Sequence, residues 1–316
     1  LVLRVDLEEQ YLERLRREFP EADVTVVTAP EELRGALGEA DAIIGGSPLS
    51  PEELAAAKRL RWVQVTSAGV EAWLTPELRE HQLVLTNFSG IAAPNIADHV
   101  LALLLAFARG LKPLLERQAR HEWGEDEAAP STFEPAGQTL GIVGLGDIGE
   151  ALAEKAHGLG MRVIAVQRHP HEPPPGVERI LPSEGLAELL EESDHVVLSL
   201  PLTDATEHIL GADELRRMRR SAYLFNIGRG GLIDQEALIA ALREGRIAGA
   251  GLDVTEPEPL PPDSALWDLP NVIITGHTAA STPRHWERGI ELLVDNVRRF
   301  LAGEELRNTV DTKAGY

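Results

Sequence analysis

The chain has 316 residues, which is long for a single hydrophobic core and sufficient for two domains. Its formal net charge of −21 disfavours nucleic acids and anionic membranes as partners, because both are themselves negatively charged. The absence of cysteine excludes disulfides, thiolate nucleophiles and cysteine-ligated metals.

Two further features concern where the protein works. The first ten residues, LVLRVDLEEQ, lack a basic region followed by an apolar one, so we expect no secretion signal. The longest strongly apolar run, VLALLLAFA at 100–108, is too short to span a bilayer. The sequence therefore predicts a cytoplasmic protein without a membrane partner.

Short strands and helices alternate in the first hundred residues. Apolar, β-rich segments predict strands at residues 2–5, 24–27, 41–46, 61–66 and 83–88. Helical spacing of apolar residues predicts a helix at 8–19, and a Ser-Pro-Glu-Glu start predicts a capped helix at 50–60. This alternation indicates a parallel α/β sheet.

A second α/β block follows one long predicted helix at 95–119, whose length suggests an element that crosses between domains. The strands expected in this block lie at 139–146, 162–166, 194–202, 222–230, 248–254 and 271–277. A last helix is predicted at 281–303, and because the first block lacks a partner for this end of the chain, we expect the helix to pack back on that block.

A glycine-rich turn is the most informative local motif. A buried strand runs into Gly144, Gly146 and Gly149, spaced GxGxxG, and then into a helix. Gly144 permits a tight turn, Gly146 allows a pyrophosphate to approach the backbone, and Gly149 allows close helix–strand packing. The alternative is an ordinary strand-to-helix turn, but strand, glycines, helix and next strand within one βαβ length favour dinucleotide binding.

The end of the next strand bears on which dinucleotide binds. A carboxylate at the position of Gln167 would hold both ribose hydroxyls of NAD and repel a 2′-phosphate. Gln167 removes that repulsion, and Arg168 and His169 could bind the phosphate through charge-assisted hydrogen bonds. We therefore predict NADP as the preferred cofactor and NAD as the alternative. The competing interpretation is that Arg168 is a solvated surface residue and selectivity is loose.

Three polar residues follow apolar strands of the second block: Arg229, Glu258 and His277. An arginine can hold a carboxylate by two contacts, a histidine can exchange a proton near neutral pH, and a neighbouring carboxylate orients the imidazole and stabilises its charged form. Each alone could be a loop charge, a solvated carboxylate or a capping histidine. Their joint placement at strand ends after a dinucleotide motif favours a catalytic set.

The motifs together closely resemble the D-isomer-specific 2-hydroxyacid dehydrogenase family, above all its glyoxylate/hydroxypyruvate reductase-like branch. The resemblance covers nearly the whole chain. The matching stretches are VTSAGVEAW, LTNFSGIAAPNIADHVLALLLAFAR, GIVGLGDIGEALAEKAHGLGMRV, LPLTDATEHIL, FNIGRGGLIDQEALIAAL, AGAGLDVTEPEPLP and NVIITGHTAAS.

The resemblance implies an α/β fold of two doubly wound parallel-sheet domains. A Rossmann dinucleotide-binding domain (98–284) would be inserted into a flavodoxin-like substrate-binding domain (1–97 and 285–316). It also implies a homodimer.

The resemblance further implies roles for the catalytic set. His277 would be the acid/base, Glu258 its partner, and Arg229 the group that holds the substrate carboxylate and polarises the keto oxygen. Backbone N–H groups of Ala68, Gly69 and Val70 would bind the same carboxylate.

The remaining implied contacts concern the cofactor. Asp147 and Ile148 would meet the pyrophosphate through their backbones, and Pro201 and Thr206 would flank the nucleotide. The residues implied around the nicotinamide and its ribose are Ile227, Gly228, Arg229, Asp253 and His277; Asp253 could otherwise merely cap its strand end.

These inferences predict NAD(P)H-dependent reduction of a small 2-keto acid to the D-2-hydroxy acid. The alternatives are a phosphoglycerate dehydrogenase-like activity and a non-catalytic nucleotide-sensing protein on the same scaffold. The other histidines, including His99 and His157 on helices, show no metal-ligand pattern, so we predict no metal and assign them no function.

Overall fold

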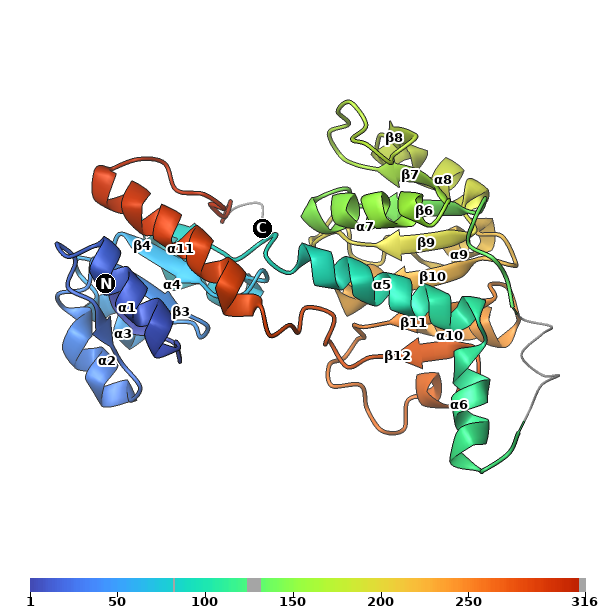
Figure 1. Cartoon of the computed structure of the whole chain (residues 1–316), viewed down its shortest axis with the longest axis horizontal. Helices are drawn as coiled ribbons and strands as arrows, with labels where there is room; N and C mark the ends of the chain where they lie inside the picture. Colours follow the sequence, from blue (N-terminus) through green and yellow to red (C-terminus); the bar gives the residue numbers. More distant parts are fainter. Residues whose placement is uncertain (82, 124–131, 313–316) are drawn as a thin grey trace. The chain divides into compact units, whose positions relative to one another are not determined.

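The computed structural model describes residues 1–81, 83–123 and 132–312. The chain forms two compact units, Leu1–Ile91 with Thr282–Tyr316, and Ala92–Ser281 (Figure 1). The chain passes from one unit to the other slightly earlier, at both places, than the division expected from the sequence.

The smaller unit contains a five-stranded sheet in the order β2-β1-β3-β4-β5, and all its neighbouring strands are parallel. This is the doubly wound, flavodoxin-like order, in which the chain starts in the interior of the sheet and winds to both edges. The strands are β1 (Val2–Arg4), β2 (Thr25–Val26), β3 (Ala42–Gly45), β4 (Trp62–Val65) and β5 (Val84–Thr86).

Alternate side chains of this sheet enter two separate cores, as the two-residue period of a strand requires. Leu3 and Ile44 pack with apolar residues of α1 and α11, whereas Val2 and Ile43 pack with those of α2, α3 and α4. The helices are α1 (Glu9–Glu18), α2 (Pro30–Leu37), α3 (Pro51–Ala56), α4 (Pro76–Glu80) and α11 (His285–Ala302). The predicted cap of α3 is present, since Ser50 and Glu53 exchange side-chain and backbone hydrogen bonds.

The larger unit contains a seven-stranded sheet in the order β12-β11-β10-β9-β6-β7-β8, again parallel throughout. This is the Rossmann order with one more strand at the end. The strands are β6 (Thr139–Val143), β7 (Arg162–Val166), β8 (Arg179–Leu181), β9 (His195–Leu198), β10 (Tyr223–Asn226), β11 (Gly249–Leu252) and β12 (Val272–Ile274). The sequence did not predict β8, a half-buried edge strand of three residues without a fully apolar run.

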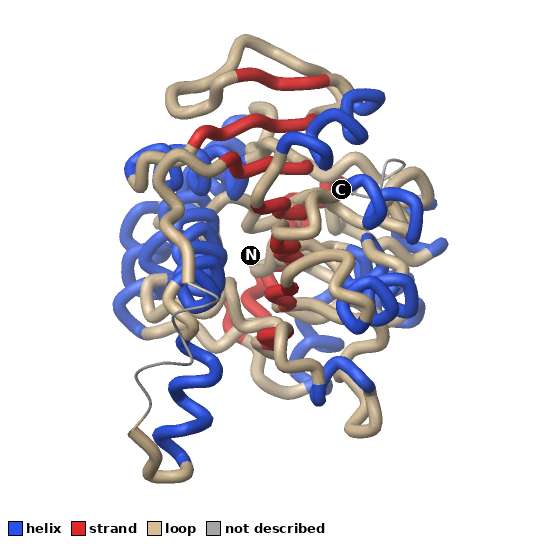
Figure 2. The backbone as a smooth tube through the Cα atoms, turned by 90° about the vertical axis from the view of Figure 1, so that its right-hand side faces the viewer, coloured by secondary structure: helices blue, strands red, loops and turns tan. Residues whose placement is uncertain are grey.

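Helices cover both faces of this sheet, which Figure 2 shows as a central band of strands between two layers of helices. Val163 and Ala165 face a core shared with α5 and α7, whereas Ile164 and Val166 face a core shared with α8, α9 and α10. The helices are α5 (Ala93–Ala108), α7 (Asp147–Gly158), α8 (Leu186–Glu192), α9 (Ala212–Arg217) and α10 (Gln235–Arg243). The prediction of two doubly wound parallel-sheet domains is thereby confirmed.

The prediction of one long helix at 95–119 is wrong. The structure has α5 and a separate α6 (Leu111–Ala119), and Gly110 between them adopts a left-handed conformation with φ of 58°. Glycine enters this region without the steric penalty of a Cβ, so the chain turns there although good helix-forming residues flank it. Over residues 1–81, 83–123 and 132–312, no helix has both the length and the apolar character needed to cross a membrane.

Candidate active site

The polar residues singled out in the second block lie at one edge of the seven-stranded sheet. They follow β6, β7, β9, β10, β11 and β12, and the carboxyl ends of parallel strands meet at the same edge. The strand order changes direction between β6 and β9, and ligands of open α/β sheets bind at such a switch point.

The three glycines after β6 differ in what the fold demands of them. Gly144 has φ of 97°, and an added Cβ would lie 2.7 Å from the Ser199 carbonyl oxygen; one on Gly149 would lie 2.6 Å from the Gly144 oxygen. Gly146 has an ordinary φ of −98°, and an added Cβ would meet nothing within 4 Å. Packing therefore explains Gly144 and Gly149, whereas Gly146 leaves open space beside the backbone.

That open space lies at the start of α7. Gly146 is the N-cap and has no side chain to accept from the N–H groups of Asp147, Ile148 and Gly149 in the first turn. A helix N-terminus with such N–H groups and its partial positive charge suits an anion. The turn thus fits the diphosphate of a dinucleotide.

Gln167, at the end of β7, carries a polar atom without a partner. Its backbone N–H donates to the Leu181 oxygen at 3.0 Å, but its buried Oε1 accepts no hydrogen bond from the described residues. The next two side chains, Arg168 and His169, are exposed. A buried acceptor in this position fits a ligand hydroxyl, and the two cationic or titratable side chains beyond it fit an anionic group.

Thr206 has a local structural role in the loop after β9. Its hydroxyl donates to the Pro201 oxygen at 2.7 Å and accepts from the Thr203 N–H at 2.8 Å. These bonds close the loop of residues 201–206, so that Thr206 fixes the backbone expected to flank a nucleotide.

Arg229 is held in the loop after β10 by a residue that the sequence did not single out. The side chain of Asn226, which is 1% exposed, donates to the Arg229 oxygen at 2.8 Å and accepts from the Gly228 N–H at 3.1 Å. The guanidinium Nη1 donates to the Gly228 oxygen at 2.8 Å. The available signal was a polar residue ending an otherwise apolar strand.

The loops after β10 and β11 touch through their backbones. An added Cβ on Gly230 would collide with the Thr255 oxygen, so glycine permits this close approach. The Thr255 N–H donates to Oε1 of Glu258 at 3.1 Å, which fixes the carboxylate beside the Arg229 loop. The fold thus brings Glu258 and Arg229 together from neighbouring strands.

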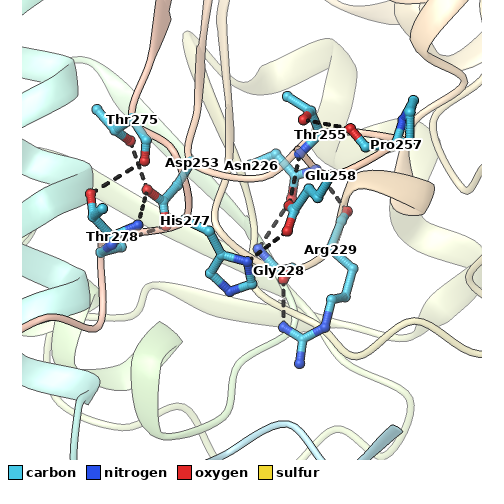
Figure 3. Close-up of polar contacts among 11 residues, drawn as sticks. Asn226, Gly228, Arg229, Asp253, Thr255, Pro257, Glu258, Thr275, His277 and Thr278 are labelled. Carbon is cyan, nitrogen blue, oxygen red and sulfur yellow. Dashed lines mark hydrogen bonds and ion pairs between the residues drawn. The ribbon is translucent and has the colours of Figure 1, made fainter. Parts of the chain in front are cut away.

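His277 completes this group. Its Nδ1 lies 2.8 Å from Oε2 of Glu258, and both side chains are partly exposed, at 50% and 37%. Figure 3 shows the imidazole of His277 and the guanidinium of Arg229 extending toward the same side of the strand ends. Because an ionised carboxylate only accepts, Nδ1 carries the proton and Nε2 is the nitrogen available to a ligand.

The turn that carries His277 is organised by Asp253. His277 has φ of 55°, in the left-handed region that side-chain-bearing residues rarely adopt. The Asp253 carboxylate, 3% exposed, accepts from the Thr275 hydroxyl at 2.7 Å, the Thr278 N–H at 2.9 Å and the Ala279 N–H at 3.0 Å. Asp253 therefore does more than cap its strand end; its contact with the nicotinamide side of a cofactor stays a prediction.

Helix α5 contributes two side chains to the same turn. His99 Nε2 lies 2.8 Å from the Thr275 hydroxyl, and Asn95 Nδ2 donates to the Ala279 oxygen at 2.9 Å. From the sequence alone, His99 was assigned no function. The signal in the sequence is that Asn95 and His99, two polar residues one turn apart, lie on a mostly apolar helix.

The predicted substrate-binding loop of residues 67–70 belongs to the smaller unit, just after β4. The Ser67 hydroxyl donates to the Gly69 oxygen at 2.8 Å, and Asn87 Nδ2 donates to the Ala68 oxygen at 2.7 Å. The loop conformation is therefore fixed by its own side chains and by the loop after β5. Among the described residues, no group of three or more His, Cys, Asp or Glu side chains could hold a metal ion.

The sequence of this chain is similar to those of known proteins of one enzyme family. Residues 101–279 match the family model described as D-isomer specific 2-hydroxyacid dehydrogenase, NAD binding domain. A glyoxylate reductase of Korarchaeum cryptofilum is 39% identical over 84% of this chain and 80% of its own length. A glyoxylate/hydroxypyruvate reductase B of Serratia proteamaculans is 38% identical over 89% of this chain and 87% of its own.

Among solved structures, an NADPH-dependent glyoxylate/hydroxypyruvate reductase of Sinorhizobium meliloti, in complex with NADP and sulfate, superposes with a TM-score of 0.84. It is 29% identical and covers 100% of this chain and 99% of its own. The larger unit is therefore a nicotinamide dinucleotide-binding domain. The chain belongs to the D-isomer-specific 2-hydroxyacid dehydrogenase family, in its glyoxylate/hydroxypyruvate reductase-like branch.

Proposed function

We propose that this oxidoreductase reduces a small 2-keto acid, of the size of glyoxylate or hydroxypyruvate, to the D-2-hydroxy acid with NADPH in preference to NADH. The observation that carries the proposal is the His277–Glu258 pair at 2.8 Å, beside Arg229 at the carboxyl edge of a dinucleotide-binding sheet. The names of the two reductases at 38% and 39% identity support this choice of substrate.

The members of the catalytic set have distinct tasks in a reduction for which a bound cofactor would supply the hydride. His277 donates its Nε2 proton to the keto oxygen, and Glu258 holds the imidazole in place through Nδ1. Arg229 binds the substrate carboxylate and offsets the negative charge that develops on the keto oxygen. Because reduction needs the imidazolium and oxidation the neutral ring, reduction should be favoured at lower pH than the reverse reaction.

The cofactor contacts are proposed along the carboxyl edge. The diphosphate would lie on the turn of Gly144, Gly146 and Gly149, with the backbones of Asp147 and Ile148. Gln167, Arg168 and His169 would bind the phosphorylated ribose. The absence of a carboxylate at Gln167 and the exposed Arg168 support a preference for NADP, and the buried Oε1 of Gln167 fits a ribose hydroxyl.

The remaining proposed contacts are less closely tied to particular observations. Pro201 and Thr206 would flank the nucleotide, and Ile227, Gly228 and Asp253 would lie near the nicotinamide and its ribose. Backbone N–H donation from Ala68, Gly69 and Val70 to the substrate carboxylate stays a prediction.

A second copy of this chain is the proposed protein partner. Helix α6 buries none of its residues, and Figure 1 shows it extending away from the sheet of its unit. Its neighbourhood exposes three large apolar side chains: Leu105 at 36%, Leu111 at 42% and Leu115 at 61%. Exposed apolar side chains that gather on one segment are typical of a protein–protein interface. Light scattering should give a dimer that Leu115→Glu weakens; a monomeric wild-type protein would contradict this part.

The test of the main proposal is a panel of 2-keto acids assayed with NADPH and NADH in parallel. We expect steady turnover with small keto acids and a higher kcat/KM for NADPH. Turnover only with phosphohydroxypyruvate would instead support the phosphoglycerate dehydrogenase-like alternative. Cofactor binding without turnover of any keto acid would support a nucleotide-sensing protein and overturn the proposal.

A further inference from the structure

We propose that His99 is a positioning residue for His277 and acts through Thr275 and Asp253. The inference rests on the proposed role of His277 as the acid/base and extends it to a helix that carries none of the predicted catalytic residues. His99 lies on α5, far in sequence from the turn that it contacts, and both belong to the larger unit.

The direction of the hydrogen bonds follows from the chemistry of the partners. An ionised Asp253 carboxylate can only accept, so the single hydroxyl proton of Thr275 is donated to it, at 2.7 Å. The Thr275 oxygen is then an acceptor for His99 Nε2, at 2.8 Å, and this nitrogen must carry a proton. The chain of donation runs from His99 through Thr275 to Asp253.

Asp253 connects this chain of hydrogen bonds to the turn that carries His277. Its carboxylate accepts the N–H groups of Thr278 and Ala279, and its backbone oxygen accepts the His277 N–H at 2.6 Å. These bonds hold His277 itself and the two residues that follow it, at a backbone with φ of 55°. A left-handed conformation at a residue other than glycine persists only where its surroundings fix it.

Helix α5 holds the turn at two points. Asn95 and His99 are four residues apart, hence on one face of the helix, and they bind the turn at Ala279 and Thr275. The network lies deeper than the group it positions, since the side chains of His99 and Asp253 are 22% and 3% exposed and that of His277 is 50% exposed. Water therefore competes less for the bonds that place the imidazole than for the imidazole itself.

The experiment compares two His99 variants. His99→Leu removes the donor, and His99→Gln keeps an N–H group near the position of Nε2. We expect His99→Leu to lower kcat for keto-acid reduction about 10- to 100-fold, because small displacements of a catalytic group are costly. The KM for the keto acid and the Kd for the cofactor should stay within about twofold, and His99→Gln should restore most of kcat. The matched control, His157→Leu on the exposed side of α7, should change none of these.

A second readout does not depend on activity. In the cofactor-free protein, amide hydrogen exchange of residues 275–281 should become faster in His99→Leu than in wild type and recover in His99→Gln. Thr275→Val should reproduce the effect of His99→Leu, and Thr275→Ser, which keeps the hydroxyl, should not. This second pair serves if His99→Leu fails to fold.

The outcomes separate the inference from the proposed function. Unchanged exchange in residues 275–281, unchanged kcat, or parallel losses that His99→Gln does not rescue would overturn the positioning role. If wild-type protein reduces no keto acid, the proposed function fails, while the exchange comparison still decides whether His99 positions the turn of His277.

Discussion

The two edges of the seven-stranded sheet hold histidines in opposite environments. At the amino edge, His195 begins β9 and is 1% exposed, with its ring centroid 5.2 Å from Phe133 and 5.8 Å from Tyr223. At the carboxyl edge, His277 is half exposed and paired with Glu258 at 2.8 Å. The imidazole of His195 is enclosed by aromatic rings, whereas that of His277 is half exposed beside a charged partner.

This difference shows how one sheet separates stability from chemistry. Burial lowers the pKa of His195 from its ordinary value of 6.5 to about 4, so the ring is neutral at physiological pH. Its Nε2 contacts Gln138 at 2.7 Å, and Nδ1 has no hydrogen-bond partner among the described residues. The ring of His195 is therefore suited to packing, whereas the carboxylate of Glu258 orients the half-exposed imidazole of His277.

The sharpest way to break this comparison is to remove the imidazole at the carboxyl edge. His277→Ala should lower kcat for keto-acid reduction about 10²- to 10⁴-fold, the usual contribution of a positioned acid/base. The melting temperature and the cofactor Kd should change little, because the side chain is half exposed. Steady-state kinetics and calorimetry measure both.

The control for that variant is His171→Ala, a change at another exposed histidine of the same unit. It should leave kcat unchanged. A His277→Ala enzyme that stays within a few fold of wild type would place the acid/base elsewhere on this edge.

The reciprocal change at the amino edge should affect stability and spare activity. The pKa of His195 is lower in the folded than in the unfolded chain, so the unfolded state binds more protons between about pH 4 and 6.5. The contribution of the neutral His195 to the free energy of unfolding is complete above pH 6.5 and is lost as the pH falls. Because of this titration, the free energy of unfolding should fall by about 2 kcal/mol between pH 7 and pH 5.

His195→Phe keeps an aromatic ring and removes the titration. The difference between urea unfolding free energies at pH 7 and pH 5 should therefore shrink by about 2 kcal/mol relative to wild type. Its kcat at pH 7 should match that of wild type. An unchanged pH dependence would mean that His195 gains access to water, or a partner, in the folded protein.

Arginines on the two edges allow a similar comparison. Arg229→Gln should raise KM for the keto acid and lower kcat/KM roughly 10- to 150-fold, which corresponds to about 1.5–3 kcal/mol for hydrogen bonds to a charged group. Arg162→Gln is the matched variant at the amino edge, where the guanidinium pairs with Glu178 on the surface. It should leave kcat/KM unchanged. Equal effects of the two variants would remove the special role of Arg229.

Much of the carboxyl edge could be predicted from the sequence because its motifs are local. The spacing of Gly144, Gly146 and Gly149 within one βαβ unit, and polar residues following apolar strands, specify which strand ends carry which groups. Parallel pairing then brings these ends together. The strands formed by fully apolar runs were also predicted, because such a run is a local pattern.

The features that sequence reasoning missed depend on tertiary contacts. The role of His99 appears only when α5 packs beside the turn of residues 275–279, because the polar residues on this helix do not indicate which segment they contact. Asn226 turns back on its own loop, which its strand pattern does not reveal. The break at Gly110 depends on one left-handed residue, and β8 on an edge that only the assembled sheet provides.

The change expected to give the smallest effect concerns cofactor selectivity and is made at Gln167. Gln167→Asp would place a negative charge where the 2′-phosphate of NADPH is proposed to lie. The ratio of kcat/KM for NADPH to that for NADH should fall at least about tenfold, which corresponds to about 1.4 kcal/mol. The same added charge in the smaller unit, Gln10→Asp, should leave the ratio unchanged. If Gln167→Asp also leaves it unchanged, the buried Oε1 faces no cofactor, and the preference must come from Arg168 and His169 alone.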